Sequence, residues 1–118
     1  MTLVDTSVWV NHFRRPEAAL VQLLADGMAG IHPYVIGELA CGNLRDRGGT
    51  LRLLGALPRA NIAREAEVHR LLESCRLWGT GLGWVDLHLL TAAAVAGWRL
   101  MTADAALNRA AAKAGVPH

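Results

Sequence analysis

The fold that we expect follows from a run near the start of the chain, Leu3-Val4-Asp5-Thr6-Ser7. Residues 2–4 fit a brief buried strand, an aspartate stands at its end, and residues 8–13 continue as a helix. In an open parallel sheet, ligands bind beyond the carboxyl ends of the strands. Such a strand brings Asp5 to the edge where these folds hold their chemistry. Capping of the next helix is the second explanation for Asp5, Thr6 or Ser7, since all three residue types cap helices well.

A second acid lies in the next predicted strand–helix pair. Residues 30–32 fit a very short strand, and residues 33–42 fit a helix with a proline at its first position. Glu38 lies among the apolar residues of that helix. It either faces solvent on the polar side or points back toward Asp5, because a glutamate is rarely buried without a partner.

Two more acids occupy comparable places in the second half of the chain. Asp86 falls in the first turn of a helix predicted for residues 85–96, where a negative charge also suits the helix dipole. Asp104 follows a strand predicted at 98–102 and so repeats the opening pattern. Asp104 also fits the cap of a helix at 105–114. Single explanations exist for each acid, but a parallel α/β sheet brings all four to one edge.

Composition places the chain among small globular proteins. Its 118 residues suit one domain spanning 1–118, and 53% hydrophobic with 19% charged residues favours a packed core. Neither a signal peptide nor an apolar run long enough to cross a membrane is expected. Cys41 and Cys75 have no metal-type spacing, and we expect them to be reduced. These features predict a cytoplasmic protein.

The four acids together predict a cation site. Carboxylates held close together repel one another unless they are protonated or share a cation. Oxygen ligands without histidine or cysteine favour Mg²⁺ or Mn²⁺ over zinc. Such ions activate water and stabilise the leaving oxygen of a phosphodiester. A metal-dependent phosphodiesterase is therefore the chemistry that we expect.

Four segments also resemble a known family. They read LVDTSVW at 3–9, GELACG at 37–42, GLGWVD at 81–86 and TAD at 102–104. In this order and spacing they are similar to the signature segments of PIN-domain nucleases, above all the VapC toxins of VapBC toxin–antitoxin pairs. The resemblance implies a three-layer α/β sandwich, with helices flanking a mostly parallel sheet of four to five short strands.

The resemblance also implies a function and a set of site residues. The function is that of a Mg²⁺- or Mn²⁺-dependent endoribonuclease toxin that forms homodimers and is inhibited by a VapB-like antitoxin in a higher assembly. Asp5, Glu38, Asp86 and Asp104 would be the catalytic and metal-binding acids, with Thr6, Ser7 and Thr102 as hydrogen-bonding supports. Position 103, often basic or polar in relatives, is alanine here.

Basic residues point to an RNA partner. Eleven of the twelve are arginine, whose planar guanidinium suits phosphate, although genome composition also favours arginine over lysine. With four acids committed to metal, the rest of the chain would carry a charge of +6. The candidates for RNA contact are Arg14, Arg15, Arg45, Arg47 and Arg52, for which a solvated surface is the alternative.

Three rival functions fit less well. A response-regulator receiver needs a paired acidic start and a lysine after a late strand, and the only lysine is Lys113. A haloacid-dehalogenase-type phosphatase needs an acid two residues after its nucleophile, where this chain has Ser7. The third rival is a PIN-like module that binds RNA or a partner without cutting.

Overall fold

The computed structural model describes residues 1–118 and has a small parallel sheet among helices. The strands are β1 (Thr2–Val4), β2 (Ala29–Gly30) and β3 (Arg99–Met101), in the order β2-β1-β3. Thr2 is in register with Ala29 on one side and with Arg99 on the other. The first strand therefore lies in the centre, and Asp5 follows it at the middle of the carboxyl edge.

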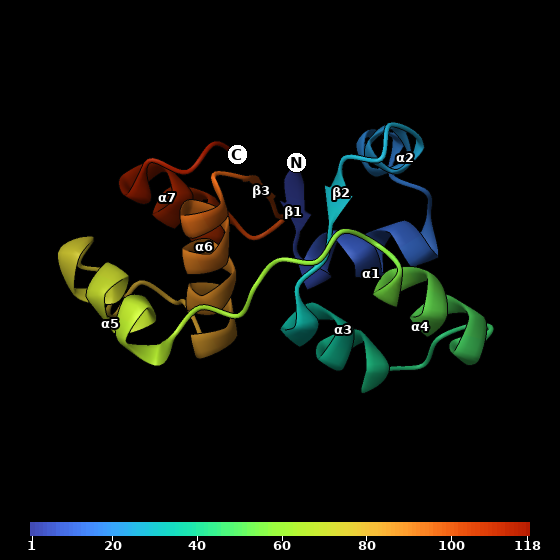
Figure 1. The fold of residues 1–118 in the computed structure, drawn as a ribbon, viewed down its shortest axis with the longest axis horizontal. Coiled ribbons are helices and arrows are strands. Elements are labelled where there is room, and N and C mark those ends of the chain that lie inside the picture. Colours follow the sequence, from blue (N-terminus) through green and yellow to red (C-terminus); the bar gives the residue numbers. More distant parts are fainter.

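Seven helices flank the sheet (Figure 1). They are α1 (Thr6–Arg14), α2 (Ala18–Ala25), α3 (Pro33–Ala40), α4 (Arg47–Gly55), α5 (Glu65–Ser74), α6 (Trp84–Ala96) and α7 (Ala105–Ala114). In the view of Figure 1, α5, α6 and α7 lie on one side of the strands and α1 to α4 on the other. This is the expected α/β arrangement. No helix has both the length and the apolar character needed to span a membrane.

The sheet has three strands, so the prediction of four to five is wrong. Two further segments touch the sheet through isolated contacts only. Arg59 forms a single parallel bridge with Ile31, and the Pro117 carbonyl accepts one hydrogen bond from Leu100 N–H at 2.8 Å. Pro58 and Pro117 lack an N–H group, so neither segment can extend a ladder through them.

The element boundaries follow local chemistry closely. Pro33 begins α3, while Gly97 and Gly115 end α6 and α7 with φ of 70°. The predicted strand at 30–32 lies one residue earlier, at Ala29–Gly30. His32 instead caps α3, because its Nδ1 accepts a hydrogen bond from Tyr34 N–H at 2.9 Å.

The core lies on both sides of the central strand. Leu3 and Val4 in β1 are fully buried, and α6 contributes a continuous buried run from Leu87 to Ala93. That run explains why α6 is apolar on nearly all sides: it packs against β1, β3, α5 and α7. The first turn of this buried helix places Asp86 next to the carboxyl edge.

Candidate metal centre

Asp5 is the centre of the site. It is 6% exposed, and its carboxylate accepts three hydrogen bonds. Oδ1 accepts a hydrogen bond from Thr6 N–H at 2.7 Å, which caps α1. Oδ2 accepts hydrogen bonds from Ser7 Oγ at 2.8 Å and from Thr102 Oγ1 at 2.7 Å. Both explanations given above for Asp5 hold at once, since it caps a helix and stands at the carboxyl edge.

Two threonines, Thr6 and Thr102, link Asp5 to two of the other acids. Thr6 Oγ1 donates to Glu38 Oε1 at 2.6 Å, so Glu38 points toward Asp5 although its helix face is exposed. Thr102 Oγ1, which donates to Asp5, accepts a hydrogen bond from Asp104 N–H at 3.0 Å. Asp104 in turn caps α7 through Ala106 N–H at 2.9 Å. These short bridges hold three acids at one edge.

Asp86 joins the group from the first turn of α6. Its Oδ2 accepts a hydrogen bond from Gly83 N–H at 2.9 Å. Partial burial raises the pKa of Asp86 above its ordinary value of 3.8. The hydrogen bond from Gly83 opposes this shift, and the negative charges of the other three acids add to it. Asp5 contributes most among these charges. The other three acids are therefore close enough for their charges to act on Asp86.

This set of ligands fits a partly hydrated divalent cation. None of the four carboxylates forms an ion pair, since the two ion pairs of the structure, Arg64–Glu67 and His69–Glu65, both lie at α5. No three acidic, histidine or cysteine side chains stand close enough to enclose a metal by themselves. Mg²⁺ keeps several waters and needs only one or two carboxylates, unlike zinc in a closed structural site.

Comparison with known proteins agrees with this geometry. The family model of the PIN domain matches residues 2–113. The chain belongs to the PIN domain family. It is also 50% identical over 117 residues to two relatives, each named Ribonuclease VapC32, from the CDC 1551 / Oshkosh and ATCC 25618 / H37Rv strains of Mycobacterium tuberculosis. Each match covers 98% of this chain and 94% of the relative. The resemblance seen in the four motifs is confirmed.

The arginines predicted to contact RNA lie on the surface of the PIN domain, away from direct contact with the acids. All five are exposed and none forms an ion pair. Two stand at the end of α1, and three lie in or just before α4: Arg14, Arg15, Arg45, Arg47 and Arg52. Figure 1 places α1 and α4 on the same side of the strands. The structure thus joins the acids and hydroxyls, but not these arginines.

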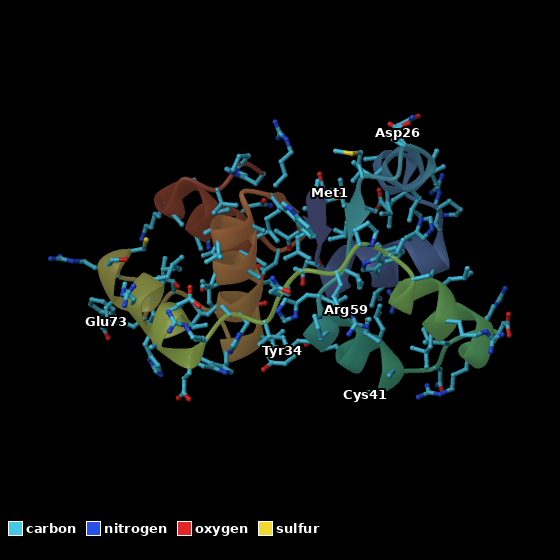
Figure 2. The ribbon with its side chains drawn as sticks, viewed as in Figure 1. Met1, Asp26, Tyr34, Cys41, Arg59 and Glu73 are labelled. Carbon is cyan, nitrogen blue, oxygen red and sulfur yellow. The ribbon has the colours of Figure 1, made fainter.

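An aromatic cluster beside the acids was not predicted from the sequence. The His88 ring of α6 lies 4.9 Å from Tyr34, 4.9 Å from Trp84 and 6.5 Å from His32. Figure 2 shows Tyr34 between the start of α3 and the end of α6 nearest to it. One signal was available, because Trp84 and His88 are four residues apart and so share a helix face. No signal in the sequence indicated that His88 would contact Tyr34 of α3, about fifty residues away.

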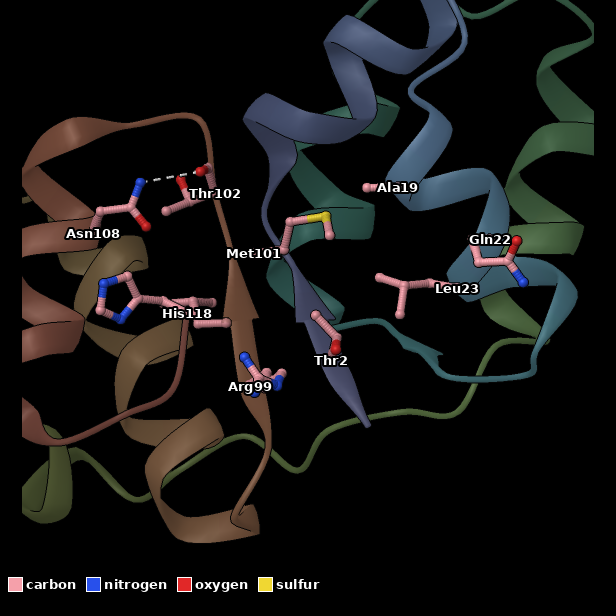
Figure 3. Close-up of a pocket in the computed structure, with 10 residues that line it drawn as sticks. Thr2, Ala19, Gln22, Leu23, Arg99, Met101, Thr102, Asn108 and His118 are labelled. Atoms are coloured by element: carbon pink, nitrogen blue, oxygen red, sulfur yellow. Dashed lines mark hydrogen bonds between the residues drawn. The ribbon is translucent and has the colours of Figure 1, made fainter.

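A pocket of the PIN domain lies next to the acids without including them. Figure 3 shows it along β1 and β3, between α2 and the C-terminal residue His118. Thr102 lines this pocket, and its carbonyl accepts a hydrogen bond from Asn108 Nδ2 at 3.3 Å. The Thr102 hydroxyl meanwhile serves Asp5. Thr102 therefore belongs both to the wall of the pocket and to the acid site.

Proposed function

We propose that this protein is a metal-dependent endoribonuclease that acts as the toxin of a type II toxin–antitoxin module. The observation that carries the proposal is the convergence of four acids at the carboxyl edge, with no basic partner, in a PIN domain. The half-identical relatives named Ribonuclease VapC32 support RNA as the substrate. We further propose that the whole chain acts as one domain in the cytoplasm.

The four acids would divide the work of holding the cation. We assign Asp5 and Asp86 to the first metal ion, and Glu38 and Asp104 to a shared or second ion or to positioning of water. The bound Mg²⁺ or Mn²⁺ would supply an activated water and charge stabilisation for an in-line displacement at phosphorus. Thr6, Ser7 and Thr102 would keep the Asp5 and Glu38 carboxylates in place through the hydrogen bonds already described.

The partners follow from the same proposal. A VapB-like antitoxin would inhibit the enzyme, and two copies of the chain would form a homodimer that joins a larger assembly with the antitoxin. The exposed arginines at α1 and α4 would contact the RNA backbone, a role that suits the bidentate guanidinium. Mass measurement of the protein with and without a VapB-like protein tests the assembly.

Cleavage of a structured RNA by antitoxin-free protein tests the activity. We expect cutting with Mg²⁺ or Mn²⁺, none with EDTA, and none by Asp5→Asn, which keeps the helix cap but removes the charge. Asp26→Asn is the matched control, because Asp26 is an exposed carboxylate at the end of α2 and hydrogen-bonds only to Gln22 (Figure 2). Equal cutting by parent and Asp5→Asn would contradict the site. If the parent and both variants bind RNA but none of them cuts it, the non-catalytic module would be favoured.

A further inference from the structure

Trp84 stands out as an exposed aromatic ring at the start of α6. It is 41% exposed, although a tryptophan in the first turn of a largely buried helix could pack inward. Its backbone is tied to the acid site, because the preceding Gly83 N–H donates to Asp86 Oδ2 at 2.9 Å. Trp84 thus directly follows a residue whose N–H group holds a predicted metal ligand.

Two histidine rings lie against Trp84, of which His88 is buried and His69 is exposed. Its centroid lies 4.9 Å from that of His88 at an interplanar angle of 84°, and 5.1 Å from that of His69 at 46°. His88 is buried and packs edge-on against Tyr34, which lies one helical turn before Glu38 on α3. The cluster therefore connects the exposed ring to both helices that carry acids, α3 and α6, and restrains its orientation.

We propose that Trp84 binds an unpaired RNA base by stacking, at a subsite beside the acids. This inference rests on the proposed nuclease function and adds that the substrate presents a single-stranded segment there. Trp84 and Asp86 are two residues apart and so point to different sides of the first turn. The stacked base consequently belongs to a different nucleotide from the one whose phosphate lies at the acids.

The charge of the site explains why stacking is needed. Four acids without a basic partner repel the RNA backbone until a cation is present. An uncharged contact that every base can make supplies affinity at this place without opposing the acids. Proteins read RNA mostly through unpaired bases that stack on aromatic side chains. A base-paired helix would not offer such a face to Trp84.

Binding of two RNA probes by full-length protein tests the proposal. One probe is a hairpin with an unpaired loop containing all four bases, and the other is a blunt duplex of the same stem. Ca²⁺ replaces Mg²⁺, and gels confirm that the RNA stays intact. We expect Trp84→Leu to weaken hairpin binding about tenfold, Trp84→Phe to retain most of it, and duplex binding to stay unchanged. Trp78→Leu is the matched control, because Trp78 is 57% exposed and has no ring partner.

The outcomes separate this inference from the nuclease proposal. Four results would each overturn the subsite. Trp84→Leu could bind the hairpin as tightly as the parent, or lose as much affinity for the duplex as for the hairpin. Trp78→Leu could show the same loss as Trp84→Leu, or the parent could fail to bind the hairpin. Melting curves confirm that the variants are folded. Cleavage is scored separately with Mg²⁺, where a rise in KM with little change in kcat supports the subsite. If the parent binds the hairpin through Trp84 but never cuts, only the nuclease proposal fails.

Discussion

Replacing Thr102 with valine removes one hydroxyl that serves two acids. The hydroxyl donates to Asp5 Oδ2 at 2.7 Å and accepts from Asp104 N–H at 3.0 Å. A hydrogen bond to a charged group contributes about 1.5–3 kcal/mol to stability and a neutral one about 0.5–1.5 kcal/mol. Both hydrogen bonds are only partly buried, so we take the lower ends and expect a loss of about 2 kcal/mol. Valine has nearly the same shape, so little of the loss comes from packing.

The expected change is large enough to measure by melting. The entropy of unfolding is about 2.1 cal/mol/K per residue, so in a chain of 118 residues each kcal/mol shifts Tm by about 4 °C. Thr102→Val should therefore melt about 8 °C below the parent, and Thr102→Ser should recover most of the difference. Cleavage should fall more than tenfold in the valine variant, because a loosened Asp5 carboxylate no longer holds its position.

Thr91→Val is the matched control for this prediction. Thr91 is more deeply buried than Thr102, but its hydroxyl donates only to the Leu87 carbonyl of its own helix, at 2.7 Å. We expect a loss below about 1 kcal/mol and no change in cleavage. A Tm for Thr102→Val within about 2 °C of the parent, or an equal loss in Thr91→Val, would refute the reasoning about stability. Unchanged cleavage in a destabilised Thr102→Val would mean that the hydroxyl supports folding only.

Two further predictions concern the packing and the pH dependence of stability. Gly30→Ala should lower stability by about 1–3 kcal/mol, because the new methyl would overlap the Trp98 ring. In Gly37→Ala the new methyl meets no atom within 4 Å, so this variant should stabilise α3 by about 0.5–1 kcal/mol. Urea titrations of both variants measure the two effects, and equal effects would contradict the packing. Burial lowers the pKa of His32 from 6.5 to about 4. As the pH is lowered, the unfolded chain therefore binds the proton before the folded chain does. The free energy of unfolding should then fall by on the order of 3 kcal/mol as the pH is lowered from about 6.5 to about 4. His32→Asn keeps a capping acceptor and should show a shallower fall, whereas parallel curves would contradict the assignment.

The sequence predicted the elements whose signals are local. Apolar residues ending at Asp5 and at Asp104 marked two strands, and the helix predicted at 105–114 has the same bounds in the structure. Proline and glycine marked the ends of several helices for steric reasons that do not depend on tertiary contacts. The convergence of the acids could be predicted because the carboxyl ends of parallel strands share one edge.

Features that depend on pairing across the fold were not predicted. The number of strands was wrong because segments beside Pro58 and Pro117 reach the sheet without forming a ladder. The cluster of His88 with Tyr34 and Trp84 depends on how α6 packs against α3, and nothing in residue spacing reports that contact. The fraction of Trp84 left exposed likewise follows from packing alone.

The alternative explanations of the acids, as helix caps or as metal ligands, turn out to be complementary. Asp5 and Asp104 cap α1 and α7, and Asp86 accepts a hydrogen bond from the N–H group just before α6. The positive ends of three helices therefore face the acids, and each contributes about 0.3–1 kcal/mol toward holding a nearby negative charge. This helps to explain how four acids gather without an arginine or lysine partner. Asparagine preserves such a cap while alanine removes it, so only the asparagine variants separate loss of charge from loss of fold.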